Sequence, residues 1–232
     1  MFLPFFDPVY LILMIPAFLL GTVATLLLNY WTKKFSKEII SNNLTGSEII
    51  NKISQKYDLR MGIDPVNNML SSSYDSTRKT LNISSDILHQ STVAGTGILA
   101  HELGHAIQDQ RGNFLSNIRI LIVPAVNIGT NIGYFLIFIG LILQISALSW
   151  IGLFLFAFTT IFILITLPLE IDASIKANRI LRENQICYTE EMPKINKILT
   201  AASLTYVAAL FQSIGQLVYF FLQVKGVSRK ND

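Results

Sequence analysis

Four long apolar stretches alternate with polar segments along the chain. They cover residues 9–30, 120–145, 150–169 and 199–224. Because a membrane-crossing helix needs about 20 consecutive apolar residues, each stretch is long enough to span a bilayer. The fourth stretch is the most polar, since it contains Thr205, Gln212, Ser213 and Gln216. The pattern predicts a mainly α integral membrane protein with about four transmembrane helices and the lipid bilayer as a partner.

The same alternation divides the chain into six parts. We expect an N-terminal membrane anchor helix at 1–31, a large polar segment at 32–119 and a transmembrane helical hairpin at 120–169. A second polar segment at 170–198, a fourth apolar helix at 199–224 and a polar tail at 225–232 follow. Neither a basic start nor a small-residue cleavage site accompanies the first stretch, so we interpret it as a retained anchor rather than a signal peptide.

The positions of Lys and Arg predict the orientation in the membrane. Residues 31–119 hold ten of the eighteen, residues 170–198 hold five, and none precedes the first apolar stretch. We therefore expect a multi-pass protein of the plasma membrane with both polar segments facing the cytoplasm. Four full crossings would place Lys225, Arg229 and Lys230 outside, against this rule. Either the fourth stretch does not cross completely, or the orientation is the reverse.

Local patterns in residues 32–119 predict a helix followed by a small β-element. Thr45 and Glu48 form a capping-box pattern, and the isoleucines that follow at helical spacing predict a helix to Tyr57. Turn-rich sequence follows, and residues 80–84 alternate as a strand does. One hypothesis is that residues 78–84 form an edge strand that binds an extended peptide; the alternative is a purely structural sheet.

Composition agrees with a membrane protein and excludes some functions. Hydrophobic residues make up 51% of the 232 residues and charged residues 14%, and the mean hydropathy is +0.49. The net charge of +3 and the lack of a basic, aromatic-rich groove argue against nucleic-acid binding. No charged residue lies inside the four apolar stretches, which argues against an ion-coupled transporter. The single cysteine, Cys187, excludes an intrachain disulfide.

The candidate chemistry lies in His101-Glu102-Leu103-Gly104-His105, within a helix predicted from Ser91 to Gln110. Histidines four residues apart project from one side of a helix and can bind one zinc ion. Glu102 points about 100° away, where it can act as a base on a metal-activated water. A chance match is expected only about once in a thousand chains of this composition.

A hydrolytic zinc ion needs a third protein ligand. His89 and Asp109 are weak candidates, because His89 is expected on a turn and Asp109 continues the histidine face of the same helix. Glu170 and Asp172 follow the third apolar stretch directly and point to different sides of a helix, so one of them can serve. We favour Glu170, with Asp172 orienting a histidine. Tyr74, His89 and Tyr206 are candidates for stabilising the tetrahedral oxyanion that forms when water attacks a peptide carbonyl.

Motifs in order along nearly the whole chain carry a resemblance to a known family. They are Thr45-Gly46-Ser47-Glu48, Tyr74-Asp75, His101-Glu102-Leu103-Gly104-His105-Ala106-Ile107-Gln108, Val123-Pro124-Ala125-Val126-Asn127-Ile128-Gly129, Leu167-Pro168-Leu169-Glu170-Ile171-Asp172-Ala173-Ser174 and Leu204-Thr205-Tyr206-Val207-Ala208-Ala209. The chain resembles the bacterial YugP-like family of neutral zinc metallopeptidases. The resemblance implies a gluzincin-like site in which His101, His105 and Glu170 bind one Zn²⁺ per chain and Glu102 is the base.

One departure qualifies the third ligand. Better-understood membrane gluzincins have an aspartate four residues after the ligand glutamate. Here that position is Ser174 and the acid is Asp172, which leaves Asp172 as the alternative ligand.

The resemblance and the motif together predict a membrane-embedded zinc metalloendopeptidase. Because Glu170 ends an apolar stretch, we expect the site near the cytoplasmic membrane surface and a membrane-associated polypeptide as substrate. The alternatives are a zinc-binding membrane scaffold without activity and, less favoured, a transporter. The sequence does not indicate an oligomeric state.

Overall fold

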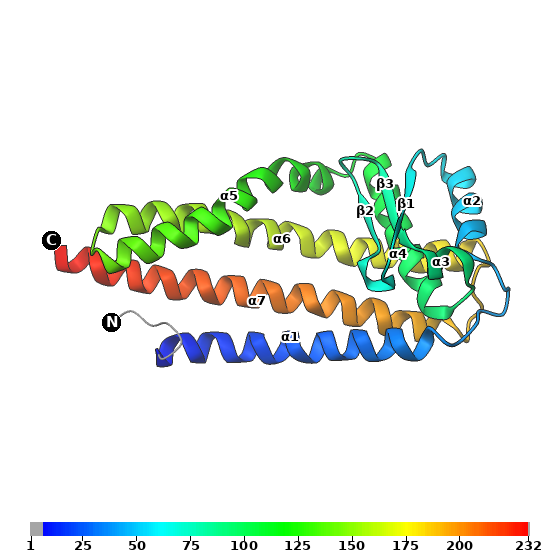
Figure 1. The fold of residues 1–232 in the computed structure, drawn as a ribbon, viewed down its shortest axis with the longest axis horizontal. Helices are drawn as coiled ribbons and strands as arrows, with labels where there is room; N and C mark the ends of the chain where they lie inside the picture. The colour runs from blue at the N-terminus through cyan, green and yellow to red at the C-terminus, as the bar shows by residue number, and fades with distance from the viewer. Residues whose placement is uncertain (1–6, 232) are drawn as a thin grey trace. The chain divides into compact units, whose positions relative to one another are not determined.

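The computed structural model describes residues 7–231 and divides the chain into two compact units. We call Met1–Val23, Leu121–Leu167 and Leu204–Asp232 the membrane unit, and Ala24–Ile120 with Pro168–Ser203 the site unit. Residues 1–6 of the predicted anchor and residue 232 of the predicted tail lie outside the described part. Figure 1 shows the order of the elements.

The four long helices, which each contribute to both units, are α1 (Pro8–Phe35), α5 (Phe114–Ile142), α6 (Ser146–Glu183) and α7 (Met192–Asn231). Of these, α1, α6 and α7 are long and apolar enough to cross a membrane. Helix α5 makes a fourth candidate if its two parts, bent by 50° between Pro124 and Gly129, count as one span. Pro124, which cannot donate a backbone hydrogen bond, lies at the edge of the bent segment. The prediction of a mainly α membrane protein is confirmed.

Glycines allow the hairpin helices α5 and α6 to approach closely in the membrane unit. A Cβ added at Gly133 would lie 2.9 Å from the Gly152 carbonyl oxygen, and one at Gly129 would lie 2.4 Å from that of Leu155. Only residues 143–145 connect the two helices, and Gln144 adopts a left-handed conformation with φ of 57°. The predicted hairpin is therefore tight because glycines leave room for the facing backbone at these positions.

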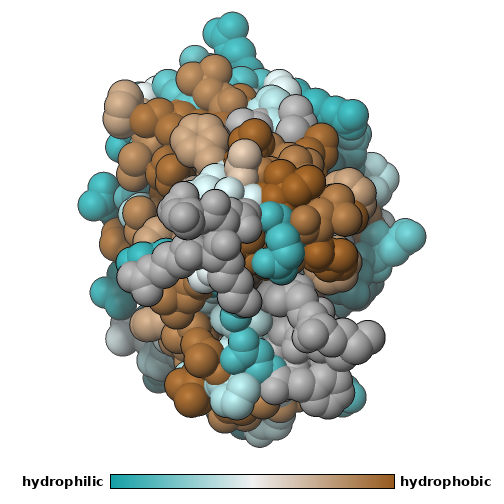
Figure 2. Space-filling model, turned by 90° about the vertical axis from the view of Figure 1, so that its left-hand side faces the viewer, coloured by the Kyte–Doolittle hydropathy of each residue, from teal (hydrophilic) through white to brown (hydrophobic). Residues whose placement is uncertain are grey.

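Large apolar side chains lie on the surface of the membrane unit. Phe18, Phe135, Phe154 and Phe211 are all exposed, and hydrophobic residues cover much of the face drawn in Figure 2 outside its grey residues. Exposed apolar area of this extent is unfavourable in water and favourable in lipid. The surface agrees with the apolar stretches in predicting contact with a bilayer.

After the end of α1, the site unit continues with a capped helix, as the sequence predicts. Helix α2 runs over Gly46–Tyr57, and Thr45 and Glu48 form the reciprocal capping box. Two further helices, α3 (Ser85–His89) and α4 (Val93–Gln110), follow the small sheet.

The sheet has three strands in the order β1-β3-β2, with bounds Gly62–Val66 for β1, Ser73–Asp75 for β2 and Thr80–Ser84 for β3. A short 3₁₀ helix, η2 (Met69–Ser71), precedes β2. Strand β3 is parallel to β1 and antiparallel to β2. Because both its edges are paired, β3 cannot add a peptide strand, and the edge-strand hypothesis for residues 78–84 is wrong. The alternative, a structural strand, is confirmed, and β2 is an edge of the sheet.

A buried apolar cluster holds α4 in the middle of the site unit. It contains Ile49 and Ile53 of α2, Leu81 and Ile83 of β3, Leu99 and Leu103 of α4, Ile180 and Leu181 of α6, and Ile195 of α7. Cys187 also belongs to this cluster and is a free, buried thiol. The orientation of α4 is thus determined by apolar contacts on the side away from its polar residues.

Candidate metal centre

Helix α4 carries the two motif histidines and lies unusually close to α6. It begins after Thr92, whose hydroxyl accepts a hydrogen bond from the Gly95 N–H. A Cβ added at Gly104 would lie 2.7 Å from the Ala173 carbonyl oxygen. Glycine at this position therefore lets the backbone of α4 approach α6 one turn after Glu170.

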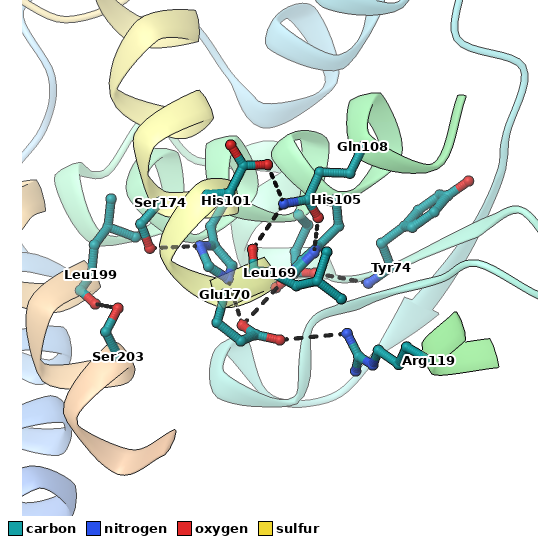
Figure 3. A network of polar contacts seen from close by, with 12 residues as sticks. Tyr74, His101, His105, Gln108, Arg119, Leu169, Glu170, Ser174, Leu199 and Ser203 are labelled. Carbon is teal, nitrogen blue, oxygen red and sulfur yellow. Dashed lines mark hydrogen bonds and ion pairs between the residues drawn. The ribbon is translucent and has the colours of Figure 1, made fainter. Parts of the chain in front are cut away.

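The close approach brings His101, His105 and Glu170 together (Figure 3). The Oε2 atom of Glu170 lies 3.3 Å from His101 Nε2 and 3.4 Å from His105 Nε2. Bonds of about 2.0–2.2 Å to a tetrahedral zinc ion would place two donors about 3.3–3.5 Å apart. Two imidazoles and one carboxylate, with donor atoms within 4.8 Å of one another, fit a zinc ion in both chemistry and spacing.

The second nitrogen of each histidine also has a side-chain partner. His101 Nδ1 lies 3.2 Å from Ser174 Oγ, and His105 Nδ1 lies 2.9 Å from Gln108 Oε1. Gln108 is 2% exposed, and its Nε2 donates to the Leu169 carbonyl oxygen at 2.8 Å. Because a carbonyl oxygen can only accept, the amide must present Oε1 to His105. His105 then carries its proton on Nδ1, and Nε2 is left with its lone pair directed toward Glu170.

Asp172 does not join the cluster. Its Oδ2 accepts a hydrogen bond from Gln108 Nε2 at 2.7 Å and forms an ion pair with Lys176. Between the two acids of the motif, Glu170 is thus the one brought to the histidines. Asp172 is one hydrogen bond further away and reaches His105 only through Gln108.

Glu102 lies beside the cluster and is 8% exposed. Its Oε2 accepts a hydrogen bond of 2.8 Å from the backbone N–H of Tyr74, on the free edge of β2. Burial raises the pKa of Glu102 to about 7, against the opposing charge of His101, because a buried carboxylate loses its hydration. A carboxyl group with a pKa near neutrality can both accept and release a proton.

Arg119, near the start of α5, approaches the same centre. Its Nη1 lies 3.5 Å from Glu170 Oε1, the oxygen that does not face the histidines. Glu170 is 3% exposed, and a buried carboxylate requires a compensating charge or hydrogen bonds. Arg119 supplies part of that compensation, as Figure 3 shows.

Gln108, Ser174 and Arg119 contact the cluster and were not predicted as site residues from the sequence. A local signal existed for two of them. Gln108 is three residues after His105, and Ser174 is four after Glu170, so each shares a helix face with a site residue. Arg119 has no such signal, because only the fold brings it to Glu170.

The weaker candidates are distributed over both units. Asp109 accepts a hydrogen bond of 2.8 Å from the Tyr74 hydroxyl and pairs with Lys79, so it joins the β2–β3 hairpin to α4. Burial raises the pKa of the Tyr74 hydroxyl well above its ordinary value, with the neighbouring Asp109 adding to the effect. His89 ends helix α3, and Tyr206 belongs to the membrane unit. Within the described residues, neither Asp109 nor His89 is grouped with the metal-type cluster.

Comparisons with known proteins agree with this geometry. Residues 10–225 match the family described as "Putative neutral zinc metallopeptidase". The chain is also 32% identical over 216 residues to "Putative membrane protease YugP" of Bacillus subtilis (strain 168), covering 88% of this chain and 95% of that protein. No solved structure matches. The match spans both units and the whole histidine–glutamate cluster, and the chain therefore belongs to this zinc metallopeptidase family.

Proposed function

We propose that the chain is a zinc-dependent endopeptidase that cleaves membrane proteins or segments beside the bilayer. The supporting observation is the spacing of 3.3 and 3.4 Å between Glu170 Oε2 and the Nε2 atoms of His101 and His105. In this proposal these three side chains hold one Zn²⁺. A fourth position remains for water, as a hydrolytic zinc site requires.

The bound ion would supply Lewis acidity, which lowers the pKa of water toward about 7 and polarises a peptide carbonyl. Glu102 takes the proton from the attacking water and then gives it to the amine that leaves. Because the Tyr74 N–H holds Oε2, we assign the proton to Oε1 of Glu102. The buried position of Glu102 favours both proton transfers, since it keeps the pKa of the carboxyl group at about 7.

Three residues would keep the ligands in place without binding the metal. Gln108 and Ser174 hold the Nδ1 atoms of His105 and His101, and Arg119 holds Oε1 of Glu170. Such partners fix the orientation and tautomer of ligands, and their loss typically weakens metal binding 10–100-fold. Asp172 would act on His105 indirectly, by accepting a hydrogen bond from the Gln108 amide.

Strand β2 is our candidate for binding the substrate backbone. It is an edge of the sheet, and the Tyr74 N–H already points toward Glu102. An extended peptide can add to such an edge through main-chain hydrogen bonds. A peptide placed there would lie beside Glu102, so the sheet and the proton acceptor would act on the same bond.

Membrane-associated substrates fit the position of the site along the chain. Glu170 follows the apolar part of α6 within one continuous helix. We propose that the centre lies at the cytoplasmic surface of the plasma membrane, on the side predicted from the Lys and Arg distribution.

Glu102→Gln tests the proposal in the purified, detergent-solubilised full chain. Zinc content is measured by mass spectrometry, and cleavage is followed with fluorescent casein and with a labelled single-span membrane protein. We expect unchanged zinc and cleavage reduced about 10²–10⁴-fold, since the ligands remain and the proton acceptor is lost. Full activity of the zinc-loaded variant would contradict the mechanism. A wild type that holds zinc and cleaves neither probe would favour the scaffold alternative.

A further inference from the structure

Two lysines from different helices converge on one indole ring in the site unit. Lys34 Nζ of α1 lies 5.4 Å from the centre of the Trp31 ring, and Lys197 Nζ of α7 lies 4.5 Å from it. The Trp31 ring stacks on Phe35 at 5.4 Å with an angle of 8° between the planes. An aromatic face attracts cations but leaves their charge unneutralised. The arrangement therefore concentrates positive charge between α1 and α7.

These lysines have no carboxylate partner, in contrast to several basic residues of the same unit. Basic residues with an acidic partner are Lys79 with Asp109, Lys176 with Asp172, Lys194 with Glu38 and Arg119 with Glu170. Among the described residues, no carboxylate lies within ion-pair distance of Lys34 or Lys197, nor of the neighbouring exposed Lys33 and Lys37. Four like charges near one another favour an anion from outside the chain.

The position along α1 indicates which anion. Trp31 and Lys34 follow directly after the apolar part of a candidate membrane span. Tyr30, which is 56% exposed, packs against Trp31 edge to face. Tyrosine and tryptophan are enriched at the level of lipid headgroups, and lysines next to a span attract anionic lipids. The phosphate of a phospholipid headgroup is therefore the anion that we expect at this position.

We infer that Trp31, Lys34 and Lys197 form a binding site for the headgroup of an anionic phospholipid such as phosphatidylglycerol. The acyl chains would lie along the apolar part of α1, and the phosphate would lie between the two ammonium groups. The inference does not depend on zinc binding or proteolysis, because none of its three residues belongs to the metal-type cluster.

Trp31 itself can report binding, because the chain has only two tryptophans. In the full chain carrying Trp150→Phe, Trp31 is the sole indole. The protein is placed in nanodiscs with a fixed mole fraction of brominated lipid, which quenches a nearby tryptophan. The brominated lipid is phosphatidylglycerol in a phosphatidylcholine background, or phosphatidylcholine in a phosphatidylglycerol background. We expect stronger quenching by brominated phosphatidylglycerol at equal mole fraction.

Charge variants on the same background assign the effect to the site. Each lysine near an anionic headgroup is expected to contribute about fivefold in affinity, so Lys34→Gln with Lys197→Gln should weaken the preference about 25-fold. Lys34→Arg with Lys197→Arg should retain it. Arg111→Gln with Lys225→Gln removes the same charge at two other exposed positions and should also retain it.

Three results would overturn the inference. The first is equal quenching of Trp31 by the two brominated lipids. The second is a preference that survives Lys34→Gln with Lys197→Gln, which would place the lipid elsewhere. The third is an equal change in Trp31 fluorescence when inorganic phosphate is added to phosphatidylcholine nanodiscs, which would make the ligand a free anion.

Discussion

Both units bring helices together at glycines, but only one of them makes a candidate reactive centre. In the membrane unit, Gly129 and Gly133 let α5 lie against α6; in the site unit, Gly104 does the same for α4 and α6. The contacts beside the membrane-unit glycines are apolar or involve hydroxyl groups, such as Thr130 with Thr159. Beside Gly104 lie two histidines and two buried carboxyl groups.

The difference shows what close packing contributes to a metal centre. A glycine contact brings two helix backbones together. The side chains one turn away then determine whether the contact only packs the helices or also groups polar side chains. In the membrane unit these residues hold helices in register. In the site unit they place three metal-type donors within 4.8 Å of one another. The comparison predicts that changes in the two units affect different properties of the protein.

The largest effect is expected from Glu170→Ala, which removes a donor from the cluster. Zinc affinity should fall by more than the roughly 10–100-fold typical of losing a partner that only orients a ligand. Isothermal titration of the metal-free protein with zinc measures it. Asp172→Asn is the matched control and should cost less. Unchanged zinc affinity in Glu170→Ala, with loss in Asp172→Asn, would make Asp172 the third ligand.

Gly104→Ala and Gly133→Ala compare the two glycine contacts directly. Each new methyl group meets a backbone oxygen, at 2.7 Å from Ala173 and 2.9 Å from Gly152, respectively. Each should lower the free energy of unfolding by about 1–3 kcal/mol. Only Gly104→Ala should also lower zinc affinity, because it separates α4 from Glu170.

Thermal unfolding with and without zinc measures both effects, and Gly226→Ala, where a Cβ meets nothing within 4 Å, is the control. If Gly133→Ala weakened zinc binding as much as Gly104→Ala, the prediction that only the site-unit contact affects zinc affinity would be wrong.

Gln108→Leu is expected to have an intermediate effect. The leucine keeps the volume but leaves His105 Nδ1, the Leu169 carbonyl and Asp172 without their amide partner. Zinc affinity should fall about 10–100-fold, and the visible absorption of the Co²⁺-substituted protein should change. Gln110→Leu removes an amide from the same helix that binds only the Asp58 carbonyl oxygen. Equal behaviour of the two variants would exclude an orienting role for Gln108.

The smallest effect is expected in the membrane unit from Thr160→Val. The Thr160 hydroxyl lies 2.7 Å from that of Ser213, between α6 and α7. Hydrogen bonds between membrane helices contribute about 0.6 kcal/mol on average, so stability should fall by about that amount with zinc affinity unchanged. A double-mutant cycle with Ser213→Ala isolates the pair. A coupling energy of zero would show that the hydroxyl contact does not stabilise the unit.

Several features of this protein were predictable because their signals are local. The apolar stretches, the capped helix at Thr45 and the spacing of His101 and His105 each depend on residues within a few turns of one another. Helix periodicity predicts which side chains share a face, and the length needed to cross a bilayer identifies the candidate membrane helices. The grouping of Glu170 with the histidines was also expected, although there the resemblance to a family added to the chemistry.

Features that depend on contacts distant in sequence were not predictable in the same way. The order β1-β3-β2 placed β2 at an edge of the sheet and residues 80–84 in its centre. Strand order follows from tertiary packing rather than from the alternation of residues along one strand. Arg119 reaches Glu170 across more than fifty positions, and Gln108 reaches Asp172 only because Gly104 lets α4 approach α6.

The sequence by itself thus determined the membrane helices, the histidine pair and the acids available to complete it. Only the tertiary structure decided which acid meets the histidines and which residues orient them. The physical reason is that helix periodicity specifies the direction of each side chain, whereas donor spacing depends on how closely two helices pack. In this protein a hydrogen atom at Gly104, in place of a side chain, allows that approach.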